Sequence, residues 1–149
     1  MLAAFLFGLF AVDAYQGAGV QLFKENQVLL VQGFRSGKWG FPKGHREPTD
    51  LDWKTVAFRE VKEETGYIHD LDYVLCDDQV ARWGSRLYWR GAMITEKEPT
   101  HNVTEHRGVQ WFPKGDMDGL RLTKDAEEWM HFDYATCKVS KIGVDGPPS

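Results

Sequence analysis

An α/β fold, an α/β/α sandwich built around a mixed β-sheet, is predicted by three features of the sequence. Short β-rich runs alternate with two segments of helical character. One run leads through a glycine-containing loop directly into the longer helix, and further β-rich runs follow it. With 149 residues, 42% of them hydrophobic, the chain can bury the core of one domain. We expect this domain to span residues 1–142, followed by a flexible tail over residues 143–149.

The elements of this fold follow in chain order. Residues 19–23 and 27–32 are predicted strands, joined by a hairpin turn at Lys24-Glu25-Asn26. After a loop over residues 33–44, the longer helix begins near residues 48–52 and ends at Gly66, which readily adopts the left-handed conformation of a helix end. Further strands are predicted at residues 71–75, 80–83, 87–94 and 109–112. Asp125 and Glu128 suggest a capping box for a closing helix that runs to about Thr136.

The end of the longer helix carries three glutamates within five residues, Glu60, Glu63 and Glu64. Successive helical residues turn by about 100°, so the three side chains project from one surface. Carboxylate oxygens suit Mg²⁺ or Mn²⁺, and an ion held this way usually keeps waters and contacts substrate phosphates. The alternative is an ordinary solvated charge run, offset by Arg59 and Lys62.

The loop before the helix favours the metal site. Residues 39–45 read Trp-Gly-Phe-Pro-Lys-Gly-His, a rigid turn, and residues 59–66 read Arg-Glu-Val-Lys-Glu-Glu-Thr-Gly. Together these segments resemble the box of the Nudix hydrolases. The first half departs from the family pattern, because Gly44 to Arg59 is one residue longer and Asp50 or Asp52 stands where a glutamate is expected. Tyr67 occupies the last place, which is normally aliphatic.

The resemblance implies a Nudix fold and a magnesium-dependent hydrolase, with Mn²⁺ as a substitute. It assigns metal binding to Glu60, Glu63, Glu64 and the Gly44 carbonyl, and Arg59 would orient one of the glutamates by a charge-assisted hydrogen bond.

In MutT-like relatives a loop glutamate shortly before a strand tryptophan reaches the metal site. Glu105 stands six positions before Trp111 and is our fourth carboxylate, with Glu96 and Glu98 as competitors. We expect Glu64 to act as the general base, with Glu60 and Glu105 behind it.

The loop also suggests a substrate. Residues 42–45, followed by Glu47 and Pro48, resemble hydrolases of diadenosine tetraphosphate, so we expect Lys43 and His45 to bind the substrate. Similar boxes occur in enzymes that decap messenger RNA and in diphosphoinositol polyphosphate hydrolases, and some relatives bind nucleotides without catalysis. A base needs an aromatic platform. Tyr88 and Tyr134 are our choices, and the wider set is Trp83, Trp89, Trp111 and Phe132.

Charge and cysteine usage restrict partners and location. A net charge of −4 and a pI near 5.7 argue against binding nucleic acid by bulk electrostatics, so a small nucleotide ranks above capped RNA. A homodimer is a further expected assembly, because family members are often dimers.

The two cysteines bear on the location of the protein. Cys76 and Cys137 show neither zinc spacing nor the density of a disulfide scaffold, which predicts reduced thiols in a reducing compartment, the cytoplasm.

The apolar run over residues 1–12 has two interpretations, an ordered first strand or a short secretory leader. A leader would make Asn102-Val103-Thr104 a glycosylation acceptor. No Lys or Arg precedes the run, and the run is too short to span a membrane, so we expect an intracellular protein without a membrane segment.

Overall fold

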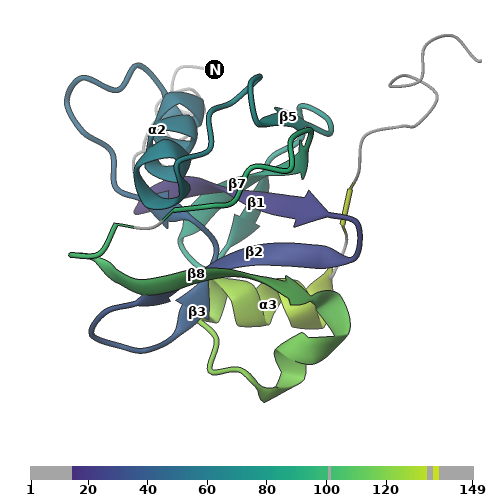
Figure 1. Ribbon diagram of the computed structural model, residues 1–149. Coiled ribbons are helices and arrows are strands. Elements are labelled where there is room, and N and C mark those ends of the chain that lie inside the picture. Colours follow the sequence, from purple (N-terminus) through teal and green to yellow (C-terminus); the bar gives the residue numbers. More distant parts are fainter. Residues whose placement is uncertain (1–14, 101, 134–135, 138–149) are drawn as a thin grey trace, which may run out of the picture.

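The computed structural model describes residues 15–100, 102–133 and 136–137, and one mixed sheet forms its middle layer (Figure 1). The strands are β1 (Gly17–Lys24), β2 (Gln27–Gly33), β3 (Trp39–Gly40), β4 (Lys43–Gly44), β5 (Tyr73–Leu75), β6 (Ala81–Trp83), β7 (Arg86–Met93) and β8 (His106–Pro113). The helices are α2 (Trp53–Thr65), the 3₁₀ helix η1 (Lys114–Gly119) and α3 (Lys124–Phe132). The first strand predicted in residues 1–12 and the predicted tail lie outside the described residues.

The sheet is ordered β3-β2-β1-β7-β5, with β4 paired to β1, β6 to β7 and β8 to β2. β1 and β7 run parallel, and the other pairs are antiparallel. Lys24 pairs with Gln27, which leaves Glu25 and Asn26 as a two-residue turn, and Glu25 has the positive φ of 54° that such turns favour. The predicted hairpin is therefore confirmed. At one end of the sheet, β1, β7 and β8 begin and β2 ends, so loops from several strands meet there.

The two helices α2 and α3 cover opposite faces of the sheet (Figure 1). Alternate side chains of the central strands divide between them, as strand geometry requires. Val20 and Leu22 belong to a buried cluster with Val61 of α2, whereas Leu30 belongs to a second cluster with Trp129 of α3. This confirms the predicted fold class. Among the described residues, no helix is long and apolar enough to cross a membrane.

The closing helix differs from its prediction. It ends at Phe132, and its N-cap is Thr123, whose hydroxyl accepts a hydrogen bond from the Ala126 amide at 3.4 Å. The predicted capping box is wrong because both of its acids serve tertiary contacts. Asp125 is buried and accepts from Arg86 Nη1 at 3.1 Å, and Glu128 accepts from the Gly84 amide at 2.7 Å.

The cysteines also differ from their prediction, because Cys76 and Cys137 form a disulfide with their Cα atoms 6.1 Å apart. The prediction of two reduced thiols is wrong for this structure. The two residues are 61 positions apart in sequence, and only the fold brings the end of β5 to the chain that follows α3.

Candidate metal-binding and catalytic site

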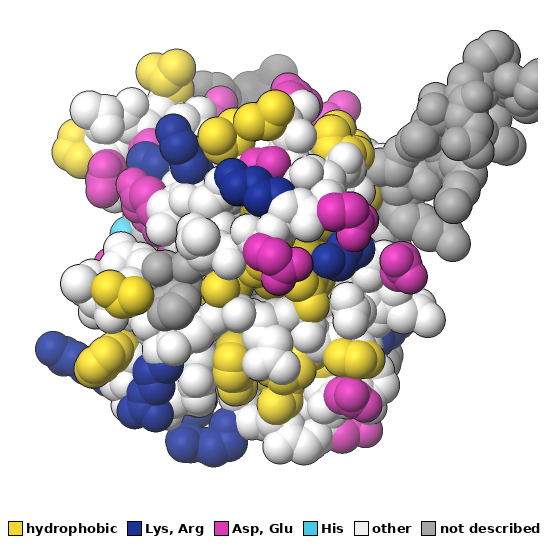
Figure 2. Space-filling view, viewed as in Figure 1, with side chains coloured by type: hydrophobic (Ala, Val, Ile, Leu, Met, Phe, Trp, Pro, Cys, Tyr) yellow, Lys and Arg dark blue, Asp and Glu magenta, His cyan; other side chains and the backbone are white. Residues whose placement is uncertain are grey.

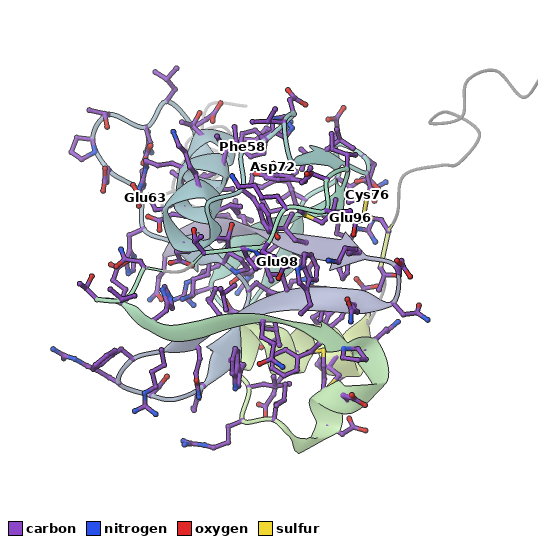
Figure 3. The ribbon with its side chains drawn as sticks, viewed as in Figure 1. Phe58, Glu63, Asp72, Cys76, Glu96 and Glu98 are labelled. Carbon is purple, nitrogen blue, oxygen red and sulfur yellow. A yellow bond between two sulfur atoms is a disulfide. The ribbon has the colours of Figure 1, made fainter. Side chains whose placement is uncertain are left out.

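A cleft of about 390 Å³ opens at the end of the sheet where β1, β7 and β8 begin. Ten residues from four segments of the chain line it: Lys43, Gly44, His45, Glu47, Glu60, Glu63, Glu64, Arg86, Glu105 and His106. The structure thus brings together every residue that the sequence analysis assigned to the metal. Glu98 is not among the lining residues, and Glu96 lies beside Cys76 at the opposite end of the sheet (Figure 3).

The three glutamates of helix α2 differ in their exposure to solvent. Asp52 caps its start by accepting from the Thr55 amide at 2.8 Å, and Gly66 ends it with a φ of 80°. Because Val61 anchors the helix in the core, Glu64 is only 4% exposed, while Glu63 remains exposed. The acidic face is therefore wet at one edge and dry at the other.

Tyr67, the departure at the end of the box, does not disturb this arrangement. Its ring is fully buried in the core cluster beneath α2, as an aliphatic side chain would be. Its hydroxyl donates to the Lys97 carbonyl at 2.6 Å, which satisfies the one polar group that an aliphatic residue would lack.

Glu64 is the most buried acid of the cleft. Its Oε1 accepts a hydrogen bond from the Lys43 main-chain amide at 3.1 Å, and its Oε2 lies 3.7 Å from His106 Nε2. The pKa of Glu64 is raised to about 8, chiefly by burial; Lys43 opposes the rise, and the neighbouring Glu60 and Glu105 add to it. Without a cation, the carboxyl is therefore largely protonated at neutral pH.

Glu60 lies directly against Gly44. A Cβ at position 44 would overlap the carboxylate of Glu60, so only glycine allows this approach. Burial raises the pKa of Glu60, although its hydrogen bond with Arg59 opposes the rise. The Gly44 backbone and the Glu60 carboxylate thus lie side by side at the cleft.

Arg59 connects the loop to the helix. Its Nε and Nη2 donate to the two oxygens of Asp50 at 3.0 and 2.7 Å, and Nη2 also donates to the His45 carbonyl at 2.9 Å. Its Nη1 donates to Glu60 at 2.9 Å and to Glu63 at 3.2 Å. These hydrogen bonds would let Arg59 orient Glu60 and Glu63, which is the role that the family resemblance predicts for it.

The structure also separates the two aspartates that could replace the missing glutamate of the box. Asp50 is 5% exposed, takes both hydrogen bonds from Arg59 and accepts from the Glu47 amide at 2.8 Å. Asp52 is exposed and only caps the helix. Asp50 is therefore the carboxylate that supports the loop, and the extra residue is absorbed within the loop.

His106 is a site residue that sequence reasoning missed. Atoms of Glu64, Glu105 and His106 that could each bind a metal lie within 4.8 Å of one another. Glu105 is exposed, so its side chain can rotate to adjust this spacing, whereas Glu64 and His106 are buried. The adjacency of a histidine to Glu105 was the available signal. Oxygen-rich donors with one imidazole fit a divalent cation.

Two cations face the acids. Lys43 lines the cleft as predicted, and Arg86, which the sequence did not single out, lines it from the first residue of β7. The buried Nε of Arg86 has no hydrogen-bond partner among the described residues, while its Nη1 is held by Asp125. Acidic and basic side chains are mixed beside α2, whereas basic ones gather by the β2–β3 loop below it (Figure 2).

The predicted aromatic platform is wrong at Tyr88. Its ring is 1% exposed and packs edge-on against Phe41, and its hydroxyl donates to Asp125, so no base can stack on it. Tyr134 lies outside the described residues. Of the wider set, the three tryptophans pack in the core clusters and Phe132 is 81% exposed on α3. Aromatic residues that line pockets adjoining the cleft are instead Tyr15 and Trp53, whose pocket shares His45 with it, and Phe34, whose pocket shares Glu105.

Comparison with known proteins points to one family. Residues 15–133 match the family model of the NUDIX domain. Over 65 residues the chain is 42% identical to the m7GpppN-mRNA hydrolase of Saccharomyces cerevisiae, a match covering 41% of this chain and 6% of the yeast protein. A 49-residue match, 51% identical, links it to 111R of Invertebrate iridescent virus 3, named as a hydrolase, over 33% of this chain and 28% of the viral protein. The chain thus spans less than a third of either relative.

Solved structures share the fold. A crystal structure of a Caenorhabditis elegans Ap4A hydrolase binary complex has a TM-score of 0.61 at 22% identity, covering 71% of this chain and 86% of that chain. The MutT NUDIX hydrolase from Burkholderia pseudomallei has a TM-score of 0.54 at 21% identity, covering 73% of this chain and 89% of that chain.

Proposed function

Because the chain belongs to the NUDIX domain family, we propose that it is a metal-dependent hydrolase that cleaves a pyrophosphate linkage, with a dinucleoside polyphosphate such as diadenosine tetraphosphate as its preferred substrate. One observation carries the proposal. The Gly44 backbone and the carboxylates of Glu60, Glu63, Glu64 and Glu105 line a single cleft together with two cationic side chains. This arrangement supplies ligands for a cation and partners for phosphate in the same place.

Mg²⁺ is the proposed cofactor, with Mn²⁺ as a substitute, held by Glu60, Glu63, Glu64, Glu105 and the Gly44 carbonyl. We add His106 as a further donor, because its ring lies with Glu64 and Glu105 in one group of potential ligands. The donor set fits such an ion, since it is rich in hard oxygen atoms and, besides burial, its neighbouring carboxylates raise the pKa values of Glu60 and Glu64, a repulsion that a bound cation would relieve. The bound ion would activate water and screen the phosphates.

The chain's own residues bind the substrate and move the proton. Lys43 and Arg86 line the cleft opposite the acids and contact the phosphates. Glu64 accepts the proton of the attacking water, with Glu60 and Glu105 as the alternative bases. Arg59 fixes Glu60 and Glu63 relative to the loop through the hydrogen bonds that it donates to both. His45 contacts the substrate from the exposed edge of the cleft.

The choice of substrate rests on the loop sequence and on the shared fold with an Ap4A hydrolase. Decapping of messenger RNA is the second choice, supported by the short match to the yeast m7GpppN-mRNA hydrolase. Diphosphoinositol polyphosphates are an alternative substrate class, because enzymes that act on them have similar boxes. A non-catalytic nucleotide-binding role ranks lower, because all three glutamates of the box and Arg59 are retained.

We keep the cytoplasm as the proposed location and a homodimer as an open proposal. The Cys76–Cys137 disulfide bears on the location, because cytosolic thiols are normally kept reduced. Thiol labelling of the protein taken directly from cells tests it, since an intact disulfide in that sample would argue for an oxidising compartment.

A substrate panel tests the activity. The protein is incubated with Mg²⁺ and diadenosine tetraphosphate, capped RNA, a diphosphoinositol phosphate, ADP-ribose or nucleoside triphosphates, and the products are identified by mass spectrometry. Fastest cleavage of the dinucleotide to ATP and AMP supports the proposal. Fastest release of a capped nucleotide moves the function to decapping. Glu64→Gln is the control, and unchanged turnover in it would reject Glu64 as the base.

A further inference from the structure

A second pocket, of about 600 Å³, adjoins the catalytic cleft. It is lined by Tyr15, Gln16, His45, Arg46 and Trp53, and it shares His45 with the cleft. The pocket lies where the chain enters β1 and where α2 begins, at the same end of the sheet as the glutamates. A molecule whose phosphates occupy the cleft therefore has this pocket immediately beside it.

The side chains of this pocket are held in place by local contacts. His45 Nδ1 donates to the Gln16 carbonyl at 2.7 Å, which ties the loop to the residue before β1. Trp53, the first residue of α2, packs against the core cluster beneath the helix and is only partly exposed. The Arg46 guanidinium lies 5.9 Å from the centre of the Trp53 ring. The pocket thus combines a fixed indole with an exposed cation.

Tyr15 provides a second ring. It is partly exposed, and the Arg82 guanidinium lies 6.0 Å from its centre. Aromatic rings and guanidinium planes are the groups on which nucleobases stack, whatever the base, because every base has a π-face. Cations beside such rings also suit a ligand that carries phosphate.

We propose that the pocket formed by Tyr15, Arg46 and Trp53 binds a nucleobase of the substrate while the polyphosphate lies in the catalytic cleft. This inference rests on the proposed function and extends it to the nucleoside. A further pocket, which includes the 54%-exposed Phe34, meets the other side of the cleft at Glu105. Aromatic residues on both flanks suit a polyphosphate with a nucleoside at each end.

Calorimetric titration tests the pocket without depending on turnover. The probes are a methylene-bridged, non-hydrolysable diadenosine tetraphosphate and inorganic tripolyphosphate, each with Mg²⁺. We expect Tyr15→Ala to weaken binding of the dinucleotide by about 5- to 150-fold, the range for loss of one stacked base. Tripolyphosphate, which has no base, should bind with unchanged affinity.

Two variants control for folding and for unspecific stacking. Tyr15→Phe keeps the ring and should bind the dinucleotide as the wild type does. Phe132→Ala removes an 81%-exposed ring on α3, outside the lining of this pocket, and should also leave binding unchanged. Circular dichroism melting of each variant verifies that it is folded.

The outcomes separate the two proposals. Full affinity of Tyr15→Ala for the dinucleotide overturns the pocket, and equal losses for dinucleotide and tripolyphosphate do the same. If the wild type does not hydrolyse the dinucleotide but Tyr15→Ala still weakens its binding, the proposed function fails and the pocket stands. Absence of dinucleotide binding to the wild type overturns both.

Discussion

Replacing Asp50 by Asn tests the contact that joins the loop to helix α2. The carboxylate of Asp50 is 3% exposed and takes two hydrogen bonds from Arg59, so the substitution leaves a largely buried guanidinium short of one charge partner. Breaking a buried pair costs about 3–5 kcal/mol. Arg59 is 19% exposed and keeps its contacts with Glu60 and Glu63, which places the expected loss near 2–3 kcal/mol, or about 5–10 °C in Tm.

Asp52→Asn is the matched control, two positions away on the same segment. Asp52 is exposed and serves as the N-cap, a position where Asn performs about as well as Asp, so we expect a loss below about 0.5 kcal/mol. Urea unfolding followed by tryptophan fluorescence measures both variants. A larger loss for Asp52→Asn than for Asp50→Asn would refute the assignment of Asp50 as the supporting carboxylate.

The pH dependence of the stability difference between the wild type and Asp50→Asn gives a second check. The hydrogen bonds from Arg59 hold the pKa of Asp50 below its ordinary value of 3.8. A depressed pKa contributes stability that is fully present above the unfolded value and is lost as the pH falls through the folded value. The stability advantage of the wild type over Asp50→Asn should therefore be constant from pH 7 to about 5 and shrink below pH 4.

Four further predictions concern the cleft and the disulfide. Gly44→Ala should lower kcat by about 100-fold because its methyl group would displace the Glu60 carboxylate, whereas Gly115→Ala, with open space around the new Cβ, should keep wild-type kinetics; equal rates for both would contradict the close approach. Burial raises the pKa of Glu64 from 4.5 to about 8, so the metal-free protein should lose stability as the pH rises through this window, while Mg²⁺ affinity rises over the same window. Titration in two buffers of different ionisation enthalpy should detect the released proton at pH 7, and its absence would reject a protonated Glu64. His106→Gln should weaken Mn²⁺ binding about tenfold and remove nitrogen coupling from the electron paramagnetic resonance of bound Mn²⁺, and an unchanged spectrum would exclude the imidazole as a ligand. Joint replacement of Cys76 and Cys137 by Ser should cost at most about 4 kcal/mol of the free energy of unfolding, the loop-entropy value for a separation of 61 residues, with unchanged kcat because the disulfide lies at the opposite end of the sheet from the cleft; a loss of activity in the folded variant would contradict that separation.

Much of the fold was predictable because local signals agree with tertiary ones here. The turn at Glu25-Asn26 and the left-handed Gly66 both ended their elements where the sequence placed them. The predicted capping box at Asp125 was wrong because there the local signal and the tertiary contact disagree. A carboxylate near a helix start can serve the helix or a distant partner, and Arg86 of β7 is visible only once the chain has folded.

The three cleft glutamates of α2 were predictable because their spacing along one helix encodes their common face, whereas Glu105 followed from the family resemblance. Long-range pairings were not. Nothing local connects Cys76 to Cys137. Nothing local shows that Tyr88 of β7 is buried whereas Tyr15, two residues before β1, lines a pocket, because only the fold decides what each ring faces. His106 was overlooked because it belongs to no part of the box, and only the fold brings its Nε2 to 3.7 Å from Oε2 of Glu64.

The register between β1 and β7 sets which side chain the cleft receives from β7. Trp83 pairs with Arg86 across the turn at Gly84 and Ser85, and Gly17 of β1 sits opposite Arg86. A slip of this register by one residue would bring Ser85 or Leu87 opposite Gly17, and it would turn the buried side chains of β7 to the wrong face of the sheet. The seven residue pairs that oppose such a slip therefore also keep the guanidinium of Arg86 at the cleft, at a position outside the box.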